Sequence, residues 1–65
     1  MDEAKKAALD YVGLAAGEVT FTKLELEKDD GVAEYEIEFY ADKKEYSFSI
    51  DAASGKILET EIDMD

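Results

Sequence analysis

The residues that could do chemistry in this chain are carboxylates. The 65-residue sequence holds 18 Asp and Glu residues and seven Lys residues, with no His and no Cys. Two carboxylates can hydrolyse a glycoside when they flank a sugar in a cleft and their pKa values differ. Here Glu34, Glu36 and Glu38 alternate along one segment, which points them to one exposed strand face where nothing separates their pKa values. With no His to activate a Ser nucleophile, we predict that the protein is not an enzyme and has no catalytic residue.

Oxygen ligands for a metal ion are abundant, but their spacing does not form a known binding loop. Asp29-Asp30-Gly31 lacks the Asp-x-Asp-x-Asp spacing and the trailing bidentate Glu of a calcium loop. A tight turn accounts for the same three residues. The glycines mark turns or a helix end, and none belongs to a phosphate-binding loop. We therefore predict no metal site and no cofactor, and keep weak binding of calcium or another cation to the acidic surface as an alternative.

The overall charge restricts the class of partner. A net charge of −11 argues strongly against nucleic-acid binding, because contact with phosphates needs a basic stripe and the sequence has none. The same charge disfavours docking on anionic lipid. No apolar run approaches the roughly 20 residues of a membrane-spanning helix, and the opening MDEAKK has no apolar core of a signal peptide. We expect a protein partner, no nucleic acid and no membrane insertion by this chain, which would be a monomer or a weak dimer.

The stretch Val32–Ile50 must position these carboxylates, because its alternation is typical of two half-buried antiparallel strands. One face is apolar and is predicted to form the core: Tyr35, Ile37, Phe39, Tyr46, Phe48 and Ile50. Tyr11 is also predicted to be buried. The opposite face is the candidate interaction face: Glu34, Glu36, Glu38, Tyr40 and Glu45.

The remaining pattern predicts an α+β fold, with one N-terminal helix packed on one face of a four-stranded antiparallel β-meander. The whole chain, 1–65, is expected to be a single domain. The expected elements are a helix over 2–12 and strands over about 19–28, 32–41, 44–51 and 56–62. The apolar stripe of the helix is Ala4, Ala7, Ala8, Tyr11 and Val12, and Gly13 should end the helix in left-handed geometry.

Two-residue turns set the expected register. Turns at 30–31 and 42–43 would bring the apolar positions of neighbouring strands onto one face. The predicted pairs are Leu26 with Tyr35, Leu24 with Ile37, Lys23 with Glu38, Phe39 with Tyr46, Ile37 with Phe48, and Tyr35 with Ile50.

The first and last strands have inconsistent parity. Val19 and Phe21 are odd-numbered, whereas Leu24 and Leu26 are even-numbered, so a regular strand cannot place all four on one face. Either a bulge lies near Thr22 and Lys23, or Val19 and Phe21 belong to a lead-in segment that packs beneath the helix. The last strand has the same problem, and a bulge or a frayed end would explain it.

The ordered set of features resembles the PepSY domain. The pieces are AKKAALDYVGL, VTFTKLELEKDDG and YEIEFYADKKEYSFSIDAASGKIL, of which the ending IDAASGKIL is the most specific. The resemblance implies a domain found in propeptides of thermolysin-like secreted metallopeptidases and in bacterial envelope or secreted proteins. It also implies inhibition or regulation of peptidases by protein contact, without catalytic residues.

The resemblance therefore favours a non-catalytic protein-interaction module, with a secreted peptidase as the expected partner and a secreted or cell-envelope location. The alternatives are a structural spacer unit of a tandem-repeat exported protein and a weak cation-binding acidic domain.

Overall fold

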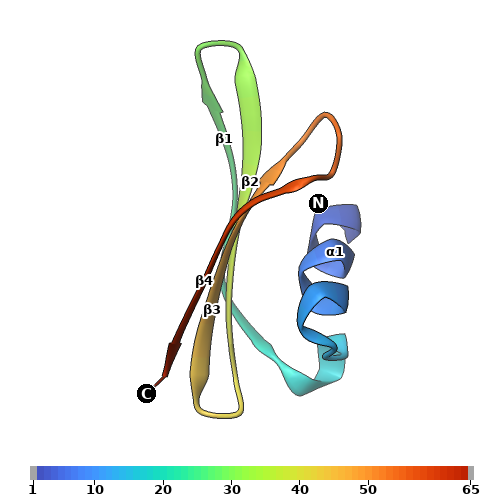
Figure 1. The fold of residues 1–65 in the computed structure, drawn as a ribbon, viewed down its shortest axis with the longest axis vertical. Coiled ribbons are helices and arrows are strands. Elements are labelled where there is room, and N and C mark those ends of the chain that lie inside the picture. Colours follow the sequence, from blue (N-terminus) through green and yellow to red (C-terminus); the bar gives the residue numbers. More distant parts are fainter. Residues whose placement is uncertain (1, 65) are drawn as a thin grey trace.

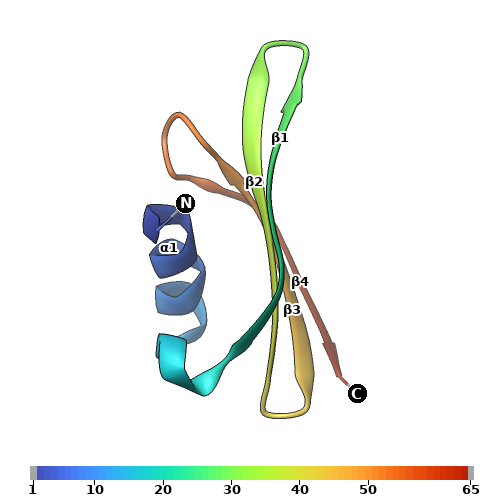
Figure 2. The same cartoon turned by 180° about the vertical axis from the view of Figure 1, so that it is seen from behind.

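A single helix covers one face of a four-stranded sheet, and the other face of the sheet is open (Figures 1 and 2). The computed structural model describes residues 2–64, apart from the side chain of Asp29, so the predicted domain limits 1 and 65 lie outside the described residues. The elements are α1 (Asp2–Val12), a 3₁₀ helix η1 (Ala16–Glu18), β1 (Thr20–Asp29), β2 (Val32–Ala41), β3 (Lys44–Asp51) and β4 (Ile57–Met64). The strands are antiparallel and lie in the order β1-β2-β3-β4. The predicted α+β fold is confirmed.

The helix ends at the glycine that the sequence indicated. Gly13 has φ +74°, a left-handed conformation that costs glycine little because it has no Cβ. The N–H of Leu14 donates to the carbonyl of Leu9 at 3.1 Å, and that of Gly13 donates to Asp10 at 3.3 Å. These two bonds form a Schellman motif, which turns the chain back toward the sheet.

Both predicted hairpin turns are present. Asp30 and Gly31 have φ of 50° and 79°, and Asp42 and Lys43 have φ of 51° and 62°. Positive φ at both central positions is what a type I′ turn requires, and its twist matches that of the flanking strands. All six predicted cross-strand pairs are observed.

Bulges explain the inconsistent parity of the edge strands. The register of β1 against β2 shifts between Phe21 and Lys23, which leaves Thr22 as the extra residue. On the other edge, Ser49 pairs with Glu59 whereas Ile50 pairs with Ile57, so Leu58 is the extra residue of β4. The bulge near Thr22 is therefore confirmed. The alternative, a lead-in segment that contains Val19 and Phe21, holds only for Val19, which precedes β1 and packs against the core. Phe21 belongs to β1 itself.

The core lies between α1 and the two central strands. Its fully buried large side chains are Phe39, Ile37 and Ile50. Phe39 stacks on Tyr46 and on Phe48, with ring centroids 4.9 and 5.7 Å apart, and meets Phe21 edge to face at 5.7 Å. The helix contributes Ala4, Ala8 and Leu9 to this core, and its small side chains allow close approach to the rings.

The predicted burial was wrong at the margins of this core. Tyr11 is 61% exposed, although its ring meets that of Phe48 in a T-shaped contact with centroids 5.8 Å apart. Leu24 and Leu26, for which only the face was predicted, lie on the helix side of β1 as expected and are 39% and 49% exposed. The β1–β2 hairpin extends well beyond the end of α1, so the helix cannot cover its outer part (Figures 1 and 2). Leu9, which the predicted stripe omitted, is buried.

Candidate functional site: the open face of the sheet

The predicted interaction residues share the sheet face opposite α1. Their register pairs them with one another and with other polar residues: Glu34 with Asp51, Glu36 with Ser49, Glu38 with Ser47, and Tyr40 with Glu45. The four residues on β2 are half-buried by their neighbours, and Glu45 on β3 is exposed. This register confirms the prediction that these side chains share one face. Their role in binding stays a prediction.

A lysine organises the charges on this face. The Nζ atom of Lys23 donates a hydrogen bond to Oε2 of Glu36 at 2.9 Å. It lies 3.8 Å from Glu25 and 3.9 Å from Glu38, which is its partner in the strand register. The predicted pairing of Lys23 with Glu38 is thus correct in register, but the closest contact is with the diagonal neighbour Glu36. Diagonal positions on paired strands lie within reach of a long side chain.

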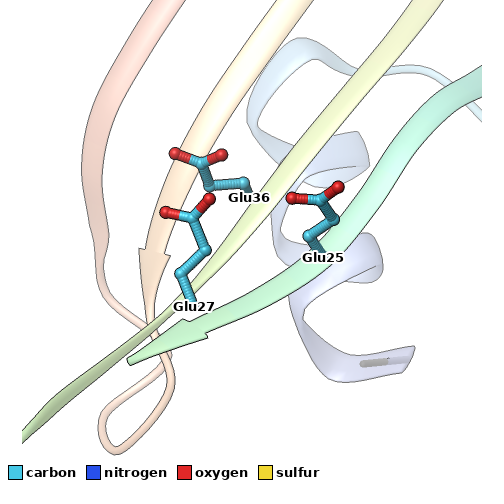
Figure 3. A group of neighbouring side chains, drawn as sticks. All are labelled: Glu25, Glu27 and Glu36. Atoms are coloured by element: carbon cyan, nitrogen blue, oxygen red, sulfur yellow. The ribbon is translucent and has the colours of Figure 1, made fainter. Parts of the chain in front are cut away.

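Three carboxylates gather on this face: Figure 3 shows Glu25 and Glu27 on β1 and Glu36 on β2. One oxygen of each lies within 4.8 Å of the others. The hydrogen bond from Lys23 is the main cause that holds the pKa of Glu36 below its ordinary value of 4.5. The negative charge of Glu36 is the main cause that raises the pKa of Glu27 above that value. At mildly acidic pH, Glu27 therefore takes up a proton before Glu36 does.

This cluster already has a cation beside it, because Lys23 lies close to Glu25 and Glu36. Three oxygen ligands could approach a cation, but the ammonium of Lys23 already supplies a positive charge at hydrogen-bond distance from Glu36. A divalent ion would have to displace that ammonium or work against its repulsion. Sequence reasoning missed the cluster, because it treated the acidic residues of β1 and β2 separately. The register that pairs Glu25 with Glu36 was sufficient to find it.

A shallow hollow runs along the open face over β2, β3 and β4, with Lys23 of β1 at one side, and its lining consists mainly of acidic side chains and two serines. In one row Ser47 lies between Glu38 and Glu61, and in the next Ser49 lies between Glu36 and Glu59. We call these six residues the acidic trough. The serines have short side chains, so they form a low floor between carboxylates on either side. A Lys or Arg side chain here would meet the carboxylates of Glu59 and Glu61, which form no ion pair with the described side chains, whereas Glu36 and Glu38 already contact the ammonium of Lys23.

Half of the carboxylates of the acidic trough were missed from the sequence. Glu59 and Glu61 belong to β4, whose parity was obscured by the bulge at Leu58. The signal that could have revealed them is the turn 51–56 followed by one extra residue, after which Glu59, Glu61 and Asp63 alternate regularly.

Comparison with known proteins now assigns the family. The profile of the PepSY family, described as "Peptidase propeptide and YPEB domain", matches residues 1–61. The chain belongs to the PepSY family. PepSY domains are non-catalytic, propeptide-type modules and occur in secreted and envelope proteins. Among residues 2–64, α1 and η1 are too short to cross a bilayer as a helix.

One curated relative extends this result. An uncharacterized protein of Streptococcus pyogenes serotype M6 is 40% identical over 58 residues, which are 89% of this chain and 45% of the relative. The chain thus spans less than half the length of that protein. No solved structure matches the chain.

Proposed function

We propose that this PepSY domain is a non-catalytic regulatory module that binds another protein, in the first place a secreted peptidase, through the open face of its sheet. The observation that carries the proposal is the acidic trough on the face that α1 leaves bare. The proposal takes residues 1–65 as one folding unit of an exported protein.

The regular strand pairing of the face supports this role. Each strand of the acidic trough is fixed in register by its neighbours, and the core beneath it is made of stacked aromatic rings. The carboxylates therefore stand at defined spacings on a surface that does not need to reorganise on binding. Preorganised surfaces lose less entropy on association.

The charge of the molecule defines the surface of the partner. With a net charge of −11, the domain attracts a basic surface over long range and repels acidic ones, which raises the association rate with a basic partner. The predicted contact residues Glu34, Tyr40 and Glu45 extend the acidic trough along β2 and β3. A Lys or Arg of the peptidase would lie over Ser47 or Ser49, between the carboxylates of two strands.

The experiment measures binding and inhibition together. The purified domain is titrated into secreted metallopeptidases of the thermolysin-like class from the organism that encodes it, with hydrolysis of a fluorogenic peptide and biolayer interferometry as readouts. The double variant Glu38→Gln/Glu61→Gln removes both carboxylates beside Ser47 and leaves the Lys23–Glu36 bond intact. The matched control Glu3→Gln/Asp10→Asn removes two negative charges from exposed positions of α1.

We expect the trough variant to weaken binding by about tenfold or more, because it removes charge-assisted contacts at the interface, and the helix variant to bind like the wild type. Equal losses for both variants would show that only net charge matters. A domain that neither binds nor inhibits any of these peptidases would favour the spacer role.

A further inference from the structure

The strand β4 ends the sheet with one side unpaired. Its eight residues, Ile57–Met64, pair with β3 only, and the strand order leaves no strand on the other side. After the bulge at Leu58, the pairing is regular from Glu59 to Met64. In both ribbon views the carboxyl end of β4 points away from α1 (Figures 1 and 2). An edge of this kind presents free main-chain donors and acceptors to another extended chain.

The two faces of β4 have opposite chemistry. Glu59, Glu61 and Asp63 pair with Ser49, Ser47 and Glu45, so they belong to the open face. Ile62 pairs with the core residue Tyr46 and therefore lies on the helix face, as does Met64 opposite Lys44.

The apolar side of this edge is left uncovered. Ile62 is 47% exposed and Met64 is 79% exposed. Tyr11 of α1 meets Phe48, whose partner on β4 is Thr60, so its ring lies over β3 next to β4. Met64 and Tyr11 are the most exposed large apolar side chains among residues 2–64. Tyr11, Ile62 and Met64 together form what we call the apolar strip.

The other edge of the sheet differs in its charges. β1 carries two lysines, of which Lys23 neutralises carboxylates of its own and the next strand. β4 contains no lysine, and within residues 2–64 none of its three carboxylates forms an ion pair. The negative charge of β4 is not offset by any lysine of the strand, so this edge favours a basic partner. On β1 the two lysines offset most of the negative charge.

The β4 strand of a second copy, paired about Glu61, does not meet this requirement. If two β4 strands paired antiparallel about Glu61, the two Glu61 side chains would face each other, and Glu59 would face Asp63. Like charges directly opposite each other destabilise a strand pair. The occupant must therefore differ in sequence from β4 itself.

We propose that the β4 edge binds an extended segment of another protein, in which basic and apolar residues alternate, as a fifth strand of the sheet. The basic side chains face Glu59, Glu61 and Asp63, and the apolar ones pack on the apolar strip. Main-chain hydrogen bonds provide the pairing, and the two alternating rows of side chains provide the selectivity. The inference rests on the proposed function, because it assumes a protein partner. To that function it adds β4 as the strand that binds and an alternation of basic and apolar residues as the sequence pattern of the partner.

The test uses three capped eight-residue peptides and the ¹⁵N-labelled protein. The first peptide alternates Lys and Val, the second alternates Glu and Val, and the third is the Lys–Val peptide with alternate backbone nitrogens methylated. Methylation removes main-chain donors and keeps the charge. We expect saturable amide shifts at residues 57–64 and at Tyr11 with the first peptide only, together with slower amide exchange along β4.

Variants on the two edges provide the matched controls. Glu61→Lys should weaken binding of the Lys–Val peptide at least about tenfold, because it places a like charge against the peptide, whereas Glu25→Lys on β1 should leave it unchanged. On the apolar side, Ile62→Thr should weaken binding, and Val32→Thr, at an equally exposed position of the open face, should not. All four positions are exposed, so the fold is expected to survive each change.

Three results would overturn the inference. The first is shifts confined to the serines and β2 carboxylates of the acidic trough, with the methylated peptide binding equally well. That result would leave the proposed function standing, because it places the contact on the face of the sheet. The second is shifts along β1, and the third is no binding of any peptide. The peptidase titration has its own readout and decides the proposed function separately.

Discussion

Lys23 donates its hydrogen bond to Glu36 at 2.9 Å and not to Glu38, the residue directly opposite it in the β1–β2 register. The contact joins the two strands immediately after the bulge at Thr22. It also places the one ammonium of this region among carboxylates from both strands. The charge pattern of the open face therefore depends on this lysine.

Replacing Lys23 by Met should raise the pKa of Glu36. The hydrogen bond lowers the pKa of Glu36 below 4.5 and raises that of Lys23 above 10.5, so the contact stabilises the folded state between those two ordinary values. The stabilisation is lost as pH falls through the folded pKa of Glu36, and also as pH rises through that of Lys23. We expect the melting temperature of Lys23→Met to be lower than that of the wild type at neutral pH, and the difference to shrink as pH falls below 4.5 and through the lowered pKa of Glu36.

The carboxyl carbon shift of Glu36, followed by NMR during a pH titration, measures the effect directly. Lys28→Met is the matched control, because Lys28 belongs to the same strand and forms no ion pair with any side chain that the structure describes. An unchanged titration of Glu36 in Lys23→Met would show that the hydrogen bond is absent in solution.

Truncating Phe48 should unfold a large part of the population. Phe48 is 3% exposed and stacks on Phe39, so Phe48→Ala is expected to cost about 3–5 kcal/mol of unfolding free energy. Small domains have a total stability of about 5–15 kcal/mol, and a chain of this length lies near the lower end. Val32→Ala, at a position that is 51% exposed, should change stability by no more than about 0.5 kcal/mol. Chemical denaturation measures both, and an unchanged midpoint for Phe48→Ala would contradict the central register.

The sequence was sufficient to predict the fold because its local signals agree with one another. Alternation in Val32–Ile50 and two turns of fixed length determine the register independently, and both give the same pairs. The exposure of Tyr11 and Leu26 could not be predicted in the same way. It depends on where an 11-residue helix lies on a longer sheet, which periodicity does not specify.

The candidate site was predicted only in part, for a related reason. The β2 and β3 residues of the open face follow from alternation alone, as with Glu38 and Glu45. The contributions of Glu59 and Glu61 depend on one extra residue in β4, and the bond between Lys23 and Glu36 depends on side-chain reach. Bulges and diagonal contacts are properties of the assembled sheet, so they appear only when the strands are paired.

Replacing Gly31 and Gly17 by Ala should change stability in different directions, because, of the two, only Gly31 has a left-handed backbone conformation. An added Cβ would have no atom within 4 Å at Gly31 or at Gly17, so neither substitution to Ala causes a clash. Gly31 has φ +79°, and Gly31→Ala should cost about 1–2 kcal/mol because an L-residue is strained there. Gly17 lies outside the left-handed region, and Gly17→Ala should be neutral or should stabilise the protein by about 0.4–1 kcal/mol by restricting the unfolded chain. Equal effects in urea denaturation would contradict the type I′ turn.

The net charge makes stability depend on salt. At −11 the folded chain repels itself, and about 0.15 M salt shortens the range of that repulsion to about 8 Å. We therefore expect the melting temperature at neutral pH to rise when NaCl is added. Near pH 4.1, the isoelectric point, the same addition should have little effect, because the net repulsion has vanished. A melting temperature that NaCl leaves unchanged or lowers at neutral pH would contradict this account.

The turn between β3 and β4 should lose part of its stability in acid. The hydroxyl of Ser54 donates to Asp51 at 2.7 Å, and this bond is the main cause that holds the pKa of Asp51 below its ordinary value of 3.8. A lowered folded pKa stabilises the protein above 3.8, and that contribution disappears as pH falls through the folded value. Ser54→Ala should therefore lower the melting temperature more at about pH 6 than at about pH 2.5.

The control for this prediction is the same Ser54→Ala change in an Asp51→Asn background, because Ser54 also takes part in a second hydrogen bond. The oxygen of Ser54 also accepts the backbone N–H of Lys56 at 3.2 Å, so Ser54→Ala has a cost that does not depend on the charge of Asp51. In an Asp51→Asn background the amide oxygen can still accept the Ser54 hydroxyl, but residue 51 carries no charge to titrate, so the effect of Ser54→Ala should be the same at both pH values. If the effect of Ser54→Ala still changed with pH in that background, the pH dependence would have to come from a group other than Asp51. Thermal unfolding of the four proteins at two pH values makes this comparison, because the change in net charge with pH cancels when each variant is compared with its parent.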